Sequence, residues 1–237
     1  MSFYLIGLGL ELKSMSLEAL ELVKKADKVF LETYTVEFPY DIEKLQEITR
    51  VKISTLSRTL VEDEKFLSEA KNKDICLLVY GAPLMATTHV SLLLKCKELD
   101  IDYRILENAS IFDAVAETGL QYYKFGKTAS MPAWSEKYKP ASFVEIITEN
   151  NKIKAHTLIL VDIGLHYSQA LEQLEEACSK KVKLDKIIIS SRLGTKESRI
   201  YYNSVEELHG KEIYAPFCII IPSKLHFLEE EALKKFS

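Results

Sequence analysis

The stretch FYLIGLGL, residues 3–10, decides the fold class of this 237-residue chain. Phe3–Leu8 is a short, continuous apolar run, which indicates a strand that is buried on both faces. Gly7 and Gly9 at its end allow a tight turn and a close approach of a ligand to the backbone. A dinucleotide-binding fingerprint would need a third glycine at position 12, where this chain has Leu12. The stretch therefore predicts an α/β sheet with a ligand-accessible turn, without the complete dinucleotide motif.

Outward from this stretch, short apolar runs alternate with amphipathic helical segments. We expect strands at Phe3–Leu8, Val29–Leu31, Ile75–Tyr80 and Tyr103–Leu106, and helices at Leu17–Ala26, Asp41–Thr49, Glu62–Lys71 and Thr88–Leu99. Ser16 is a candidate N-cap of the helix Leu17–Ala26, and Thr88 is a candidate N-cap of the helix Thr88–Leu99. On the second of these helices, Val90, Leu93 and Leu94 are expected to face inward. This alternation predicts a parallel, Rossmann-like sheet.

Beyond residue 108 the pattern changes, because strands become more frequent relative to helices. The strands expected there are His156–Val161, Lys186–Ser190, Ser198–Tyr202 and Phe217–Ile221, and the helices are Ile111–Leu120, Ala141–Asn151, Ser168–Ser179 and Leu225–Lys235. This pattern predicts a mixed sheet. We therefore expect two α/β lobes, residues 1–108 and 109–237, without a Pro- or Gly-rich linker between them.

The composition excludes several classes of protein. With 47% hydrophobic and 28% charged residues the chain is neither disordered nor of low complexity. A net charge of −4 argues against a general nucleic-acid binder. The four cysteines have no metal or redox spacing and are predicted to be buried and reduced. No basic leader and no membrane-spanning apolar run is present, which predicts a soluble, cytoplasmic protein.

A second glycine turn, Gly81-Ala82-Pro83, follows the strongest apolar run. Ligands of open α/β sheets bind outside the carboxyl ends of the strands, so the turns at Gly9 and Gly81 predict one ligand crevice. The alternative is that each turn only ends its strand. Glu32 lies at the position where a dinucleotide-binding site has the acidic residue that binds the ribose. A dinucleotide site is therefore an alternative, but the missing third glycine disfavours it.

Three side chains are candidate proton acceptors. Asp162 follows an apolar strand, where a carboxylate needs a partner or a function, and His89 and His226 lie near helix starts. For each of them a helix cap or a satisfied structural side chain is the alternative, so no catalytic residue is singled out. Three charged stretches are interpreted as packed loop or solvated surface: Tyr122–Lys127, Lys180–Lys183 and Glu229–Glu231.

Taken together, an ordered set of segments resembles the diphthine synthase family. The segments are GLGL at 7–10, APLMATTH at 82–89, ASI at 109–111, TGLQ at 118–121, YKFGK at 123–127 and PSKLH at 222–226. The resemblance runs from residue 1 to about residue 235. Each segment is short, and it is the order and spacing of the whole set that make the resemblance specific.

The resemblance implies a two-lobed fold of the tetrapyrrole methylase type, with S-adenosylmethionine bound in a cleft between the lobes. It implies a homodimer that methylates a modified histidine of elongation factor 2, with no metal, nucleic acid or membrane involved. The compact length favours trimethylation of the amino group over the additional methyl ester. By resemblance, the residues that contact the cofactor, or its product S-adenosylhomocysteine, are Leu10, Ala82, Met85, Ser110, Ile111, Val161, Leu193 and Phe217.

One departure from the family pattern concerns the second turn. The family usually has Gly-Asp-Pro where this chain has Gly81-Ala82-Pro83, so a carboxylate that would bind the cofactor is missing. The alternatives within the same superfamily are a corrin- or porphyrin-precursor methyltransferase and an RNA ribose methyltransferase. From another class, Ala82 could mark a cofactor-binding protein that has lost catalysis.

Overall fold

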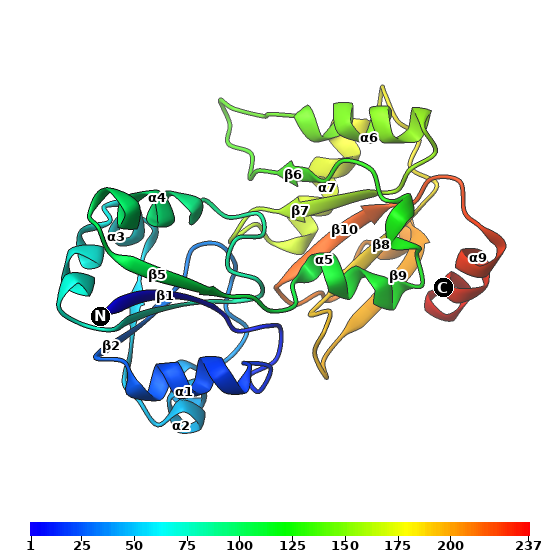
Figure 1. Cartoon of the computed structure of the whole chain (residues 1–237). Coiled ribbons are helices and arrows are strands. Elements are labelled where there is room, and N and C mark those ends of the chain that lie inside the picture. Colours follow the sequence, from blue (N-terminus) through cyan, green and yellow to red (C-terminus); the bar gives the residue numbers. More distant parts are fainter. The chain divides into compact units, whose positions relative to one another are not determined.

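The first apolar run forms an interior strand of a parallel five-stranded sheet with the strand order β3-β2-β4-β1-β5. Its strands are β1 (Ser2–Gly7), β2 (Lys28–Glu32), β3 (Ile53–Leu56), β4 (Ile75–Val79) and β5 (Asp102–Leu106). The computed structural model describes residues 1–237, and this sheet belongs to a unit that spans Met1–Asp113, here called the N-terminal lobe (Figure 1). The parallel sheet predicted from the sequence is confirmed.

The side chains of β1 and β4 point alternately to the two faces of this sheet, and they contribute to a hydrophobic core on each face. Phe3, Leu5 and Leu77 belong to one buried cluster, and Ile6 and Leu78 belong to the other. Helices α1 (Leu17–Lys25) and α2 (Ile42–Thr49) pack on the second cluster, while α3 (Arg58–Glu62), a 3-10 helix (Lys65–Lys71) and α4 (Val90–Glu98) pack on the first (Figure 1). Burial on both faces is the reason that these strands read as continuous apolar runs.

Helix α1 begins and ends as its sequence predicts. The Ser16 hydroxyl accepts a hydrogen bond from the Ala19 amide at 3.1 Å, which satisfies one of the free N–H groups of the first turn. Glu18 lies in the first turn, and Lys24 and Lys25 lie in the last, where each charge opposes the nearby end of the helix dipole.

The second unit, Ala114–Ser237, is the C-terminal lobe and contains a mixed sheet with the order β6-β7-β10-β8-β9. Only β6 and β7 pair in parallel, and the other pairs are antiparallel. Its strands are β6 (Ala129–Met131), β7 (Thr157–Val161), β8 (Lys186–Ser191), β9 (Arg199–Ser204) and β10 (Phe217–Ile221). Helices α6 (Ser142–Lys152) and α7 (Tyr167–Cys178) bury the larger core. The helices α8 (Val205–Leu208) and α9 (Phe227–Leu233) also belong to this lobe, whereas α5 (Ile111–Ala114) spans the boundary between the two units. The predicted mixed sheet is confirmed.

The structure corrects several predicted elements. The expected helix Glu62–Lys71 is interrupted at Glu64, whose φ of 56° lies in the left-handed region, so α3 ends before the 3-10 helix begins. The expected helix Ile111–Leu120 is only α5 followed by a 3-10 helix (Val115–Thr118), because Gly119 at φ +81° ends it. Strands β3 and β6 were not predicted at all.

Helix α4 is oriented differently from the prediction. Leu93 is buried, but Val90 and Leu94 are 56% and 62% exposed, so the inward face was assigned wrongly for those two residues. His89, rather than Thr88, precedes the first helical residue, and no side chain caps this helix. The correct face contains Leu92 and Cys96, which are spaced four residues apart and are fully buried.

Three further observations bear on the classes excluded above. All four cysteines are free and buried, as predicted, and burial raises the pKa of Cys76 and Cys218 to about 12. None of the helices is long and apolar enough to cross a membrane. No three His, Cys, Asp or Glu side chains lie together in a group that could hold a metal ion.

The boundary between the two lobes is predicted from the sequence after residue 108. In the structure the first compact unit ends at Asp113. The assignment of domains stays a prediction.

Candidate functional site

The exits of β1 and β4 are tied directly to each other. The Gly9 amide donates to the Gly81 carbonyl at 3.2 Å, and the Gly81 amide donates to the Gly9 carbonyl at 3.0 Å. Both residues have positive φ, +71° and +80°, and a Cβ on Gly7 would lie 2.7 Å from the Gly81 carbonyl oxygen. The glycines therefore allow two loops to touch. Because each N–H group donates to the carbonyl of the other glycine, this turn is not a phosphate-binding loop.

Asn108 fixes the third exit, which follows β5. Its side-chain amide donates to the carbonyls of Gly7 at 3.1 Å and Ser14 at 2.9 Å, and its carbonyl oxygen accepts from the Ala109 amide at 2.8 Å. Strands β4, β1 and β5 are neighbours in the sheet, so their carboxyl ends form one edge. The predicted contacts of this lobe follow these three exits: Leu10, Ala82, Met85, Ser110 and Ile111. Whether they touch a cofactor stays a prediction.

These five residues differ in what they can offer a ligand. Leu10, Ala82 and Ser110 are at most 8% exposed, whereas Met85 is 50% exposed. The Ser110 hydroxyl and amide both donate to one Asp113 carboxylate oxygen, at 3.1 and 2.7 Å. The side chain of Ser110 is thus engaged in the turn that begins α5, which leaves shape and the backbone as the principal recognition elements along this edge.

The loop after β4 carries local backbone strain. Ala86 has φ 55°, a left-handed conformation that costs a non-glycine residue about 1–2 kcal/mol. The Pro83 carbonyl accepts from the Thr87 hydroxyl at 3.1 Å, and its oxygen lies 2.8 Å from His89 Nδ1, which fixes the ends of the strained segment. The strain lies beside Met85, one of the predicted contacts.

In the C-terminal lobe the three predicted contacts also share one edge of a sheet. Val161 ends β7, Phe217 begins the antiparallel β10, and Leu193 follows the end of β8. Phe217 pairs with Ser191, and its neighbour Cys218 pairs with Leu160, so the register brings these positions together. The structure thus gathers the predicted contacts into one cluster within each lobe.

The turn that presents Leu193 is held from several sides. Arg192 has φ 51°, and its Nε donates to the Ala215 carbonyl at 3.0 Å while its guanidinium forms an ion pair with Glu197. The Glu117 carboxylate accepts from the Gly194 amide at 2.7 Å. Leu193 was predicted by family resemblance, but these supports were not predicted, because a turn-forming ion pair leaves no periodic signal in the sequence.

The carboxylate of Glu32 does not serve a ribose. It is 3% exposed and accepts from the amides of Tyr34 at 2.9 Å and Thr35 at 3.0 Å, and also from the Thr35 hydroxyl. These three bonds close a turn directly after β2. The dinucleotide alternative therefore loses its acidic residue, in agreement with the missing third glycine.

The three candidate proton acceptors all have structural partners. His89 is 1% exposed, with Nδ1 at the Pro83 carbonyl, and its side chain does not cap α4. Asp162 is exposed rather than buried at the strand end, and it accepts from the Ala133 amide at 3.1 Å. His226 is the N-cap of α9. Nε2 of the buried His89 has no hydrogen-bond partner, and the group that accepts the proton stays unassigned.

The chain matches the family described as Tetrapyrrole (Corrin/Porphyrin) Methylases over residues 2–209. A curated relative from Methanococcus aeolicus named diphthine synthase is 37% identical over 97% of this chain and 96% of the relative. One from Schizosaccharomyces pombe named diphthine methyl ester synthase is 33% identical over 99% and 94%. A crystal structure of diphthine synthase, 33% identical, superposes with a TM-score of 0.89 over 100% of this chain and 96% of that one.

The chain belongs to the diphthine synthase family. The family and the α/β fold predicted from the sequence are thereby confirmed, as is the assignment of the chain as a methyltransferase of diphthamide biosynthesis. The structure offers buried backbone groups, glycine turns and apolar side chains at the predicted contacts, and such a set suits a nucleoside held by shape and main-chain bonds. The residues present therefore fit S-adenosylmethionine.

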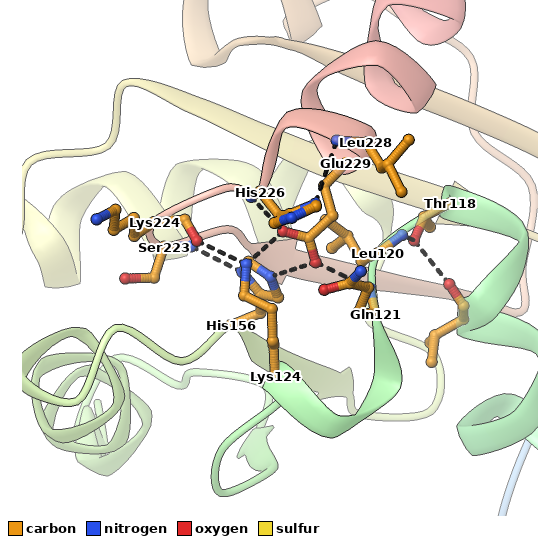
Figure 2. Close-up of polar contacts among 11 residues, drawn as sticks. Thr118, Leu120, Gln121, Lys124, His156, Ser223, Lys224, His226, Leu228 and Glu229 are labelled. Atoms are coloured by element: carbon orange, nitrogen blue, oxygen red, sulfur yellow. Dashed lines mark hydrogen bonds and ion pairs between the residues drawn. The ribbon is translucent and has the colours of Figure 1, made fainter.

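Three segments by which the chain resembles the diphthine synthase family meet at one carboxylate, that of Glu229 (Figure 2). This side chain is 0% exposed, which corrects its assignment to a solvated acidic run. One oxygen accepts from the Lys124 ammonium and from the His226 amide at 2.7 Å. The other accepts from the Gln121 amide at 2.9 Å and lies 3.2 Å from His156 Nε2. The Glu229 network, these five residues, was missed from sequence.

The electrostatics of the Glu229 network follow from these contacts. Burial raises the pKa of the Glu229 carboxyl, but Lys124 and the amide donors outweigh burial and hold this pKa at about 2. Burial lowers the pKa of the His156 imidazole below 6.5. The neutral imidazole accepts from the Ser223 amide through Nδ1 at 2.9 Å, which places its proton on Nε2, toward Glu229. The network is thus a buried ion pair with a neutral histidine beside it.

Proposed function

We propose that the chain trimethylates the amino group of a 3-amino-3-carboxypropyl-histidine on elongation factor 2, with S-adenosylmethionine as the methyl donor. Family membership supports the reaction class, since relatives of nearly equal length are named diphthine synthase. The observation that carries the proposal is the gathering of the predicted contacts at one sheet edge within each lobe, which in the N-terminal lobe is the edge of the Gly9–Gly81 bridge. We further propose that it acts as a cytoplasmic homodimer.

The chemistry asks little of individual side chains. S-adenosylmethionine, when bound, supplies a methyl group that is already activated on a sulfonium. The chain's residues would align the amine with that methyl group and exclude water, which shape and main-chain contacts can do. The buried turns at Leu10 and Ala82 suit this task. The attacking amine must be neutral, and its proton has no assigned acceptor among the residues described above.

The deciding assay is methyl incorporation into elongation factor 2 that carries the aminocarboxypropyl-histidine. Labelled S-adenosylmethionine should transfer its methyl group to this factor and not to the unmodified factor, which is the matched control. Mass spectrometry then counts the methyl groups on the residue. Failure to label the modified factor, with S-adenosylhomocysteine shown by calorimetry to bind, would refute the proposed substrate and favour a tetrapyrrole, an RNA ribose or a protein that has lost catalysis.

A second candidate reaction is methyl ester formation on the same residue, because the Schizosaccharomyces pombe relative is named diphthine methyl ester synthase and is 33% identical over 94% of its length. The product distinguishes the two reactions, since an ester is cleaved by mild base and a trimethylammonium group is not. A base-labile methyl group in the product would establish the ester reaction.

Ala82 gives an internal test of the cofactor site. An Asp here would restore a charged acceptor, and a charge-assisted hydrogen bond is worth roughly 1.5–3 kcal/mol, or about tenfold or more in affinity. Because Ala82 is only 6% exposed, the same carboxylate would be buried in the ligand-free protein and would lower its stability. We expect Ala82→Asp to bind S-adenosylhomocysteine more tightly and to melt earlier when free. The neutral Ala82→Asn is the control, and an unchanged affinity in Ala82→Asp would show that another group replaces the acid.

A further inference from the structure

Two phenols converge on a single carbonyl oxygen of the first turn. The hydroxyls of Tyr40 and Tyr80 both donate to the Leu10 carbonyl, at 2.8 Å and 2.9 Å. Tyr80 directly follows β4, and Tyr40 lies just before α2, so the donors come from segments far apart in the sequence. Neither tyrosine belongs to the segments by which the chain resembles its family.

Their rings hold these hydroxyls in place. Phe38 packs edge-on against Tyr40 and Tyr80, with ring centroids 5.6 Å and 5.8 Å apart, and the two tyrosine rings lie 6.4 Å apart. Edge-to-face aromatic pairs have defined geometry, so the three rings form one packed unit. The loop between β2 and α2 is thereby fixed over the turn that contains Leu10.

A carbonyl oxygen has two lone pairs, and here both are occupied. The Leu10 carbonyl cannot therefore accept a hydrogen bond from a ligand, which leaves the N–H group and the side chain as what Leu10 can offer. We propose that Tyr40 and Tyr80 are positioning residues that lock the Leu10 peptide in the orientation required to bind the methyl donor. This proposal rests on the proposed function, because it takes Leu10 as a cofactor contact.

The shared acceptor predicts a distinctive pattern of effects. Either hydroxyl alone still holds the oxygen, so removing one should weaken binding only slightly. Removing both frees the peptide to rotate. A neutral hydrogen bond corresponds to about 2- to 12-fold in an equilibrium constant. We expect each single Tyr→Phe change to raise the Kd for S-adenosylhomocysteine about 3-fold or less, and the double change to raise it about 20-fold or more, beyond the product of the singles.

The experiment compares Tyr40→Phe, Tyr80→Phe and the double variant by calorimetry with S-adenosylhomocysteine. Phenylalanine keeps the ring packing, so loss of the aromatic unit does not confuse the result. Tyr103→Phe is the matched control, because Tyr103 pairs with Phe3 at the opposite, amino-terminal end of the same sheet. Hydrogen exchange of the ligand-free proteins over residues 8–12 provides a second readout, and faster exchange is expected in the double variant alone.

Coupling between the two changes, with faster exchange over residues 8–12, supports the proposal. Additive single effects, or an unchanged Kd in the double variant while the unaltered protein binds, would overturn it and leave the proposed function intact. A fall in thermal stability without a change in Kd would also overturn it, since that is what a purely structural role predicts. Absence of binding by the unaltered protein would refute the cofactor site and this proposal together.

Discussion

Replacing Glu229 by Gln should destabilise the C-terminal lobe severely. Each carboxylate oxygen faces two groups: Lys124 and the His226 amide on one side, the Gln121 amide and His156 on the other. A glutamine has one oxygen and one NH2 group, so one pair of donors would meet another donor instead of an acceptor. The Lys124 ammonium, whose side chain is 20% exposed, would also lose its counter-charge.

The magnitude follows from these losses. A buried donor left without an acceptor costs about 1–3 kcal/mol, and breaking a buried ion pair costs about 3–5 kcal/mol in all. We therefore expect Glu229→Gln to lower the free energy of unfolding by about 3–5 kcal/mol and the melting temperature by on the order of 10 °C. The control is Lys127→Met, which breaks an ion pair with Glu149 whose side chains are 70% and 53% exposed. That change should cost less than about 1 kcal/mol.

The assay can use a probe that the chain already contains. Trp134 is the only tryptophan and lies in the C-terminal lobe, so its fluorescence during urea unfolding reports on that lobe. Lys124→Met combined with Glu229→Gln should cost less than the sum of the two single changes, since the double variant leaves no unpaired charge. A loss in Glu229→Gln as small as in Lys127→Met, or strictly additive effects, would refute the reasoning.

Three further outcomes are expected from unfolding measurements. Gly9→Ala should lower the free energy of unfolding by about 1–3 kcal/mol more than Gly164→Ala does. Both glycines have positive φ, but only at Gly9 would a Cβ meet other atoms, the nearest at 2.7 Å. Equal losses of free energy in the two variants would contradict this. Ala86→Gly should leave the free energy of unfolding unchanged or raise it by up to about 1 kcal/mol, because relief of the left-handed strain outweighs the added freedom of the unfolded chain. A clear loss of stability would show that Ala86 is unstrained. Stability should fall as the pH drops below 6.5, where unfolded His156 takes up a proton that the folded state resists, and fall again between pH 4.5 and about 2 as Glu229 protonates. His156→Gln should remove the first step, and its persistence in that variant would assign it to another group.

The elements that the sequence predicts well are those whose physics is local. Strand β4 is apolar at every position because both of its faces are covered, and the Ser16 cap needs only the residues beside it. Strand β3 escapes prediction because Ile53 and Leu56 are buried while the two residues between them are exposed, a pattern that does not alternate. The three residues of β6 are too few to show any period.

The Glu229 network shows a different limit. Three adjacent glutamates resemble a solvated run, and only Glu229 of the three is buried. A signal did exist, since Glu229 lies four residues before the fully buried Leu233 and so on the inward face of α9. Its partners Lys124 and His156 are distant in sequence, however, and no local pattern connects them. The candidate contacts at Ala82 and Leu193 came from family resemblance, because turns after strands carry no period of their own.

The segments that resemble the family divide by position into two physical tasks. Residues 7–10, 82–89 and 109–111 follow neighbouring strand exits of the N-terminal lobe, where they present glycines, buried backbone and a strained loop. The remaining segments meet at Glu229 and fix the C-terminal lobe. The resemblance of the segments around Glu229 is thus evidence about the architecture. The resemblance of the segments at the strand exits is evidence about the ligand. Changes around Glu229 should therefore alter unfolding far more than cofactor affinity, whereas Ala82→Asp should alter affinity as well as stability. If substitutions around Glu229 changed affinity as strongly as Ala82→Asp does, this division of tasks would be wrong.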